Sequence, residues 1–338
     1  MNKWNNLAAY LPTSSFSAVM GMGIVSDALL QLHLYSISQL LEYSDIVVYL
    51  GLVLLFILLL VTKWRIAKKS LLNHFSVLGS FTFIAGTAVL ATRLSESGFV
   101  FVDVPAITVS LIIFLLFLFI LALSVEGSVF ENVEDPYLFL VPFIALLGIS
   151  VLASQTFEKL DNGYPVLFSI SVITWAVGFA GTSIFMIYTF KNFGKKFFTH
   201  NEINGFYFIY SGIASLIAFS GIVMIRFYHL DNQILIAFMT YVTALEFIWA
   251  VGFSIFLFSI YFLKFRKGLI KFRHSVTVWG SVFPIGVNAM GSYFVSLYFH
   301  IHFLVYLSYF YAFAGVFLIV VDLLEIIGFS IFQRSGDQ

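Results

Sequence analysis

The sequence predicts an all-α integral membrane protein, with ten transmembrane helices arranged as five tandem helical hairpins around a central pore. Two observations favour this fold class. Of the 338 residues, 61% are apolar and 10% are charged, whereas a soluble domain carries about 25% charged residues. Apolar stretches of roughly 20 residues, long enough to cross a bilayer, also recur along the whole chain. No soluble segment fits between them, so we expect a single transmembrane domain over residues 1–338.

The ten spans follow from these apolar stretches in chain order. The stretch from Val104 to Val125, for example, contains no charged residue, and basic residues follow the second, sixth and eighth spans. We expect the helices at residues 15–35, 45–63, 73–92, 104–125, 136–154, 168–190, 204–225, 235–263, 275–297 and 303–326.

The distribution of basic residues predicts the orientation of these spans. Fourteen of the 17 Lys and Arg residues fall in the tails and in connections on one side, and Arg93, Lys159 and Arg226 fall on the other. Basic residues are enriched in cytoplasmic loops. We therefore expect a multi-pass protein of the cell membrane with both termini in the cytoplasm, and Lys68, Lys195 and Lys267 on the cytoplasmic side.

Glycines predict which helix of each hairpin lies inside. Every two-helix hairpin starts on the same side, so the hairpins form a tandem repeat in one orientation. The first helices hold most of the glycines, and small residues permit close helix packing and leave room along an axis. Candidate pore-lining or hinge glycines are Gly21, Gly23, Gly86, Gly212 and Gly286. The alternative is that these glycines mark tight packing only.

Two prolines, each within the first helix of its hairpin, indicate interrupted helix backbones. Proline has no N–H and opens the helical turn before it, and in a membrane the freed carbonyl needs water or protein as a partner. Pro284 and Pro142 are therefore candidate pore-lining or hinge residues, with an ordinary packed kink as the alternative.

Polar side chains within the spans suggest how anions would be stabilised. We expect no Lys or Arg in the middle of the membrane, which disfavours a tight anion site built on a buried cation. Hydroxyl and amide groups such as those of Ser215 and Asn288 offer weaker stabilisation that suits conduction.

Two carboxylates, Asp27 and Glu246, lie within predicted spans. An intramembrane acid is a candidate functional residue. Both are candidate proton sites, and a structural role in helix contacts is the alternative for each.

Several function classes lack support in the sequence. No phosphate loop, nucleophile elbow or dinucleotide fingerprint is present, so we do not expect an enzyme or a cofactor. His300 and His302 form no closed ligand set, and we expect no metal site. No basic tract indicates nucleic-acid binding.

Two motifs resemble those of a known family. The segment Phe16-Ser-Ala-Val-Met-Gly-Met-Gly-Ile-Val-Ser26 resembles the first helix of the tellurite-resistance/dicarboxylate transporter family, and Trp279-Gly-Ser-Val-Phe-Pro-Ile-Gly286 resembles its ninth. That family includes the bacterial tellurite-resistance protein, the plant slow anion channel and the yeast malate permease. The resemblance implies five hairpins around a pore, homotrimers with one pore per subunit, and a pore gate that falls on Phe283.

Three functions remain open at this stage. The first is a gated, channel-like conduit for small anions, such as chloride, nitrate or organic acids, across the cell membrane. The second is a proton-coupled carrier or exporter of C4-dicarboxylates, sulfite or tellurite that uses Asp27. The third is a non-transporting membrane scaffold.

Overall fold

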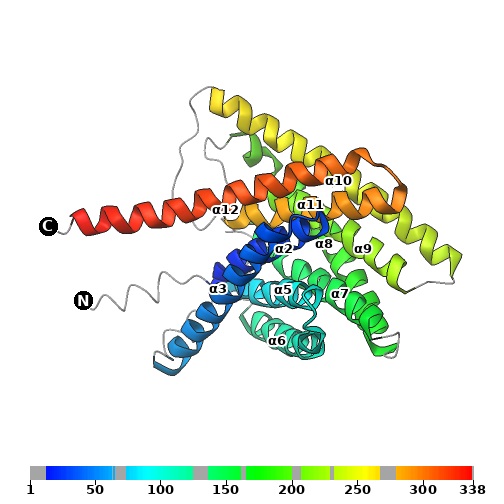
Figure 1. The fold of residues 1–338 in the computed structure, drawn as a ribbon, viewed down its shortest axis with the longest axis horizontal. Helices are drawn as coiled ribbons and strands as arrows, with labels where there is room; N and C mark the ends of the chain where they lie inside the picture. The colour runs from blue at the N-terminus through cyan, green and yellow to red at the C-terminus, as the bar shows by residue number, and fades with distance from the viewer. Residues whose placement is uncertain are drawn as a thin grey trace.

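The computed structural model describes residues 13–62, 64, 74–124, 136–160, 165–199, 207–228, 232–266 and 279–336. Within these residues the chain forms ten α-helices and three short 3₁₀ helices, and no strand (Figure 1). The α-helices are α2 (Ser17–Gln31), α3 (Tyr35–Thr62), α5 (His74–Glu96), α6 (Asp103–Ser124), α7 (Val141–Lys159), α8 (Pro165–Thr199), α9 (Phe208–Phe227), α10 (Gln233–Arg266), α11 (Trp279–Phe299) and α12 (Phe303–Gly336). The 3₁₀ helices are η1 (Thr13–Phe16), η2 (Val100–Val102) and η3 (Pro136–Leu140).

The helices have the length and composition of membrane spans. Nine segments among the described residues are long and apolar enough to cross a bilayer, and α2 is a shorter apolar helix that continues from η1. The predicted all-α membrane fold is confirmed. Lys68 and Lys267, which we expect on the cytoplasmic side, lie outside the described residues.

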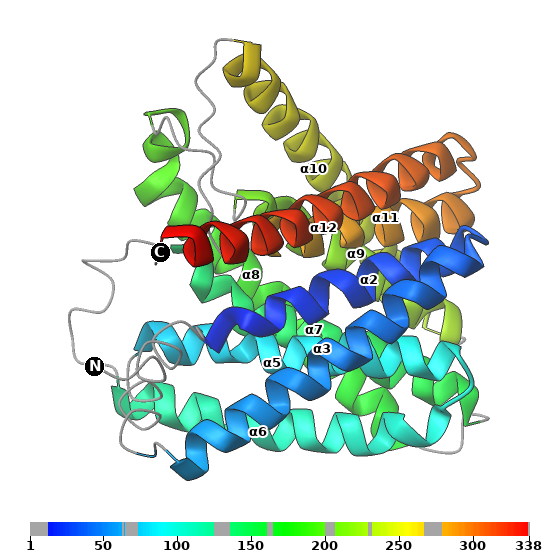
Figure 2. The same ribbon diagram turned by 60° about the vertical axis from the view of Figure 1, so that its left-hand side comes forward.

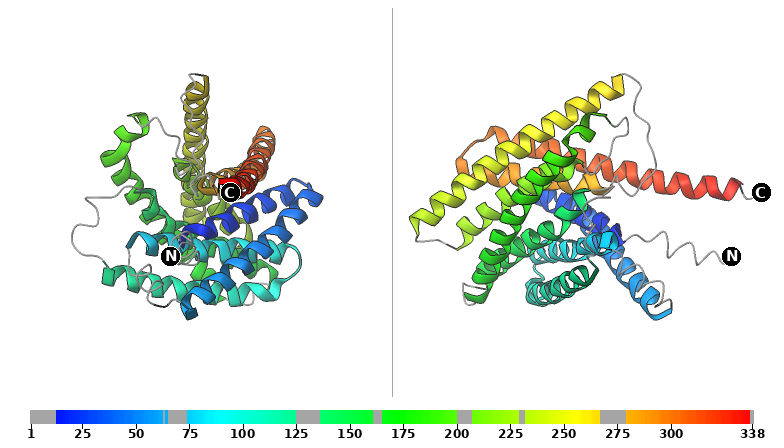
Figure 3. Two further views of the ribbon diagram at one scale, coloured as in Figure 1. Left: turned by 90° about the vertical axis from the view of Figure 1, so that its left-hand side faces the viewer. Right: turned by 180° about the vertical axis from the view of Figure 1, so that it is seen from behind.

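Five helices form a closed inner ring. Each of α2, α5, α7, α9 and α11 packs against the next, and α11 packs back against α2. The remaining five helices each pack on the inner helix of their own hairpin. In Figure 2, the C-terminal end of α10 projects away from the ring, and Figure 3 shows the outer helices spreading outward from the centre.

Burial distinguishes the inner helices from the outer ones. In the spans of α5, α7, α9 and α11, between 78% and 94% of the residues are buried, against 6% to 33% in the spans of the outer helices. α2 is also buried along nearly its whole length. Exposed Leu, Ile, Val and Phe side chains cover the outer helices, as expected of a surface that faces lipid.

Three hairpins turn in the same way. His33, Gly98 and His300 each have positive φ directly after an inner helix. The N–H of the next residue then bonds a carbonyl five residues back, as in the pair Leu34 and Leu29 at 2.8 Å. This is the Schellman arrangement, and its recurrence after α2, α5 and α11 supports the tandem repeat.

Serine hydroxyls join the two helices of several hairpins. Ser26 and Ser38 each donate to the other's carbonyl at 2.8 Å, which joins α2 to α3. Ser150 and Ser171 make the same exchange at 3.0 and 3.1 Å between α7 and α8. Single bonds of this kind run from Ser211 to the Ala250 carbonyl and from Ser308 to the Ala289 carbonyl. These bonds fix four of the five outer helices, α3, α8, α10 and α12, against their own inner helices.

One helix start differs from the expectation. The structure begins α3 at Tyr35 rather than at residue 45. The residues of this first part include Ser38 and Glu42, whose polarity lowers the mean hydropathy on which the expected start depended. Both side chains are buried against the ring, so the polar segment is helical because the ring supplies its partners.

Candidate functional site

A small cavity of about 20 Å³ lies inside the inner ring. All five inner helices contribute to its wall, so it lies on the axis that the ring surrounds. Its lining residues are Ile24 and Asp27 from α2, Ala85, Val89 and Thr92 from α5, Ile144, Gly148 and Val151 from α7, Leu216 and Phe219 from α9, and Phe283 from α11.

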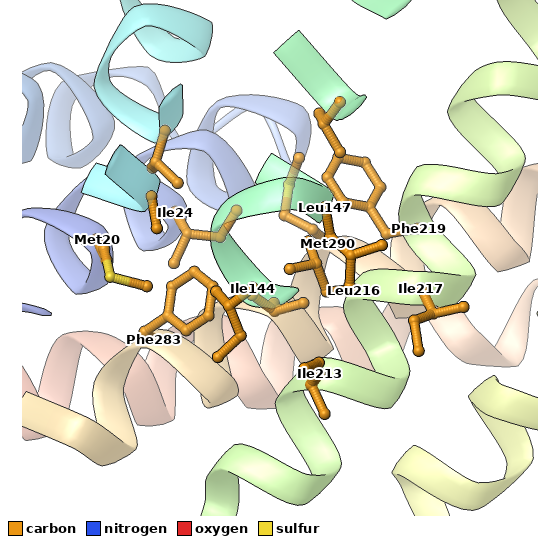
Figure 4. Packing of buried hydrophobic residues seen from close by; sticks show 14 of the residues in the cluster. Met20, Ile24, Ile144, Leu147, Ile213, Leu216, Ile217, Phe219, Phe283 and Met290 are labelled. Carbon is orange, nitrogen blue, oxygen red and sulfur yellow. The ribbon is translucent and has the colours of Figure 1, made fainter. Parts of the chain in front are cut away.

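Phe283 occupies this axial position from α11. Its side chain is 4% exposed, and Figure 4 shows its ring among the side chains of Met20, Ile24 and Ile144. The aromatic ring therefore fills space between helices on opposite parts of the inner ring. Phe283 is thus one of the side chains that line the axial cavity.

The backbone next to Phe283 is supported by a glycine. Pro284 lies inside α11 and lacks the N–H that would bond the carbonyl one turn back. Gly212 of α9 lies directly against it. A Cβ added at Gly212 would come within 2.5 Å of the Pro284 Cα. The α9 and α11 backbones therefore meet at the residue that follows Phe283.

The other predicted glycines also lie at helix contacts. A Cβ at Gly21 would meet Val282 at 2.9 Å, and one at Gly286 would meet Ile24 at 2.5 Å, so α2 and α11 pack closely. Gly86 lies against Phe16 and Val19. Gly23 lies between Val89 and the Asp45 carboxylate, and a Cβ added at Gly23 would come within 2.7 Å of the first and 2.9 Å of the second. The geometry supports the tight-packing interpretation for these residues, whereas Gly148 is among the cavity-lining residues.

Ser215 and Asn288 connect helices instead of facing the cavity. The Ser215 hydroxyl donates to the Val287 carbonyl of α11 at 3.2 Å. The Asn288 amide donates to Ser211 of α9 at 2.8 Å and to Ser254 of α10 at 2.9 Å. Asn288 is 1% exposed. Both side chains hold α11 in place against its neighbours.

Pro142 does not interrupt a helix. It lies in the first turn of α7, directly after the 3₁₀ helix η3. An N–H at that position would have no intrahelical partner in any case. Pro142 therefore frees no carbonyl in the interior of α7, because this helix starts at Val141, and the expected interruption at Pro142 is wrong.

Asp27 lines the cavity and is 2% exposed. Its Oδ1 lies 3.8 Å from the Nε of Arg93. Arg93 makes a shorter ion pair with Glu42 of α3, at 2.8 Å from Nη2. Arg93 also donates to Ser26 at 2.9 Å and to Ser38 at 3.1 Å. The guanidinium thus ties α5 to both helices of the first hairpin.

The sequence places Arg93 in a connection after the third predicted span, at residues 73–92, whereas the structure buries it at the end of a helix. Arg93 falls in the last turn of α5 and is 1% exposed. From its sequence position near the end of a span, Arg93 would be expected in a solvated connection. Its burial is favourable because α2 and α3 bring acids and serines to the guanidinium. Glu42 and Asp45 were also not identified from the sequence as buried acids. Their spacing of three residues places both on one face of a helix and would have indicated a polar face.

Glu246 lies apart from the cavity. It belongs to the outer helix α10 and is partly exposed, next to the exposed Leu245. The structure therefore brings Asp27, and not Glu246, to the axial cavity.

Comparison with known proteins matches the chain to one family. The model of a protein family described as voltage-dependent anion channel, SLAC1, matches residues 10–327. No curated protein matches the chain. The family match spans all ten helices and agrees with the resemblance to the tellurite-resistance/dicarboxylate transporter family. The chain therefore belongs to the voltage-dependent anion channel (SLAC1) family.

Proposed function

We propose that this protein is a gated, channel-like conduit for small anions across the cell membrane, with Phe283 as its gate. One observation carries the proposal: Phe283 lies in a cavity to which all five inner helices contribute. Chloride, nitrate and small organic acids are the expected cargo. The family match supports anion transport in general, and the identity of the gate rests on the position of this ring.

The lining chemistry suits passage better than tight binding. Thr92 and Asp27 supply the polar side chains among the lining residues, and the remainder are apolar or glycine. An ion that meets few strong partners is not retained, which conduction requires. Pro284 removes one backbone N–H from α11 beside Phe283, and Gly212 of α9 lies against it, so a small displacement of α11 at this point would move the ring off the axis.

Assembly and orientation form part of the same proposal. We expect a homotrimer with one pore per subunit, because the outer helices leave extended apolar faces for lipid or for neighbouring copies. We also expect both termini in the cytoplasm, following the distribution of basic residues. The chain then functions as one transmembrane domain.

Substitution Phe283→Ala tests the gate. We expect a large rise in anion conductance of the purified protein in planar bilayers, because the truncated side chain leaves space on the axis that water can enter. The matched control is Phe81→Ala. Phe81 is also buried, but it packs edge-on against Phe114 and Phe117 of α6. The control should lose about 3–5 kcal/mol of unfolding free energy without gaining conductance. Unchanged current in folded Phe283→Ala protein would refute the gate.

The carboxylate of Asp27 favours a second candidate, a proton-coupled carrier of organic acids, sulfite or tellurite. Asp27 is the ionisable residue among those that line the cavity. A carrier would move protons together with anions and give slow uptake, whereas a channel would give anion current without proton flux. Measuring internal pH and anion content of the same vesicles separates the two.

A further inference from the structure

The inward face of α3 is mainly polar, unlike the rest of that helix. Its buried residues are Ser38, Leu41, Glu42 and Asp45. The three polar positions follow the spacing i, i+4 and i+7, which places them on one face of a helix. An outer helix thus presents two carboxylates to the ring, at the end where the hairpins turn and next to Asp27.

One buried cation serves these acids. Arg93 bonds Glu42 at 2.8 Å and donates to three serine hydroxyls, those of Ser26, Ser38 and Ser97. Its contact with Asp27 is longer, at 3.8 Å. The guanidinium is therefore committed mainly to Glu42. Asp27 receives only part of its charge, and among the described residues Asp45 forms no ion pair with Arg93.

Asp27 and Asp45 lie close to each other across α2. The Asp45 carboxylate touches the position of a Cβ on Gly23, at 2.9 Å, and Gly23 precedes Asp27 by one helical turn. The two acids therefore lie along the same stretch of α2, about one helical turn apart. Within the described part of the chain, no oxygen of either carboxylate accepts a hydrogen bond, and both side chains are at most 2% exposed.

The charged groups around Asp27 are few. Besides Asp45, they are Glu42 from α3, Arg93 and Glu96 from α5, and Lys159 from α7. Lys159 is itself paired with Glu96 at 3.4 Å. Two buried carboxylates that share less than one positive charge do not both ionise, because burial and like-charge repulsion both oppose the second ionisation. The pair then holds a proton.

We propose that Asp27 and Asp45 form one proton-binding site beside the axial cavity, and that anions pass when Asp27 carries the proton. This inference rests on the proposed anion conduit and adds its regulation. Asp27 lines the cavity, so its ionised form repels an anion that enters, whereas its neutral form does not. The Asp45 carboxylate lies against Gly23, one helical turn before Asp27, and two buried like charges at this part of α2 oppose each other's ionisation. The proton comes from water and returns to it, and it is not carried across with the anion.

The test measures anion conductance as a function of pH on the full-length protein in a Phe283→Ala background, so that the gate does not mask the response. We expect conductance to rise as pH falls. Asp27→Asn should abolish this dependence and raise the conductance at high pH by roughly tenfold to a hundredfold, since a nearby charge in a poorly solvated site acts strongly. Asp45→Asn should move the midpoint of the response to lower pH.

Glu246→Gln is the matched control, because it neutralises a membrane carboxylate that lies outside the cavity. Its pH response should equal that of the background protein. A pH response that survives Asp27→Asn, or one that disappears with Glu246→Gln, would overturn the inference.

A second measurement does not depend on current. The infrared carbonyl stretch of a protonated carboxyl group should be present in the unmodified protein at neutral pH and weaker in the Asp27→Asn/Asp45→Asn double variant. An identical band in both proteins would overturn the proton site. If no variant conducts anions but the band behaves as expected, the proposed conduit fails and the proton site stands.

Discussion

At the scale of single residues, the contact between Gly212 and Pro284 determines how closely α9 approaches α11. The atoms nearest to a Cβ at Gly212 include the Pro284 Cα, at 2.5 Å. A backbone atom cannot move aside in the way that a flexible side chain does, so any larger residue must displace a helix. Since Phe283 directly precedes Pro284, that displacement also shifts the ring in the cavity.

We expect Gly212→Ala to lower the free energy of unfolding by about 1–3 kcal/mol, the cost of overpacking, and to raise basal anion leak. The control is Gly252→Ala on α10, where an added Cβ meets nothing within 4 Å. That change should be neutral or stabilise by up to about 1 kcal/mol, because alanine favours helix. Thermal unfolding in detergent compares the two. Equal stability of both variants would argue against a rigid contact at Gly212.

At the scale of elements, α3 is attached to the ring through polar contacts. Only four of its described residues are buried, and three are polar. The Ser26 and Ser38 exchange and the Arg93 to Glu42 ion pair supply the specific bonds. Apolar burial contributes little here, since lipid is as apolar as the rest of the α3 surface. The ion pair should therefore matter more for α3 than for other outer helices.

Removing one partner of this ion pair should cost more than removing both. We expect Arg93→Met to lower the free energy of unfolding by about 3–5 kcal/mol, because Glu42 remains as an uncompensated buried charge. The double variant Arg93→Met/Glu42→Leu should recover most of this loss, since two apolar groups replace the pair. Chemical denaturation of the single and double variants measures the coupling. Additive losses would mean that the pair contributes no interaction energy.

The sequence predicts the elements better than their contacts. Apolar length predicts ten helices because a bilayer imposes it, and the structure has ten among its described residues. Sequence reasoning failed where a partner from another helix reverses the cost of burial. From the sequence, Arg93 is expected in solvent, but in the structure α3 supplies Glu42 as its buried partner. Pro142 is expected to kink a helix, but in the structure η3 ends just before the helix that contains it. Asn288 is expected from the sequence to line the pore, but in the structure its amide donates hydrogen bonds to Ser211 and Ser254.

At the scale of the whole molecule, the repeated hairpin accounts for the closed ring. The Schellman turn recurs after three inner helices, and serine bonds join four of the hairpins internally. Each hairpin is thus a similar unit with a buried and an exposed helix. Because all units point the same way, their inner helices can close around one axis, and the described turns after α2, α5 and α11 lie at the same end of the molecule (Figure 2).

This common direction yields a test of orientation. The chain has no cysteine, so single cysteines report their own position. We expect Lys68→Cys, Lys195→Cys and Lys267→Cys to resist a membrane-impermeant thiol reagent in intact cells and to react after permeabilisation. His302→Cys, at the exposed turn between α11 and α12, should react in intact cells, because this turn follows the ninth predicted span whereas the basic connections follow the second, sixth and eighth. If two of the three lysine positions were labelled from outside, the proposed orientation would be wrong for the whole protein, since we expect all five hairpins to share one direction.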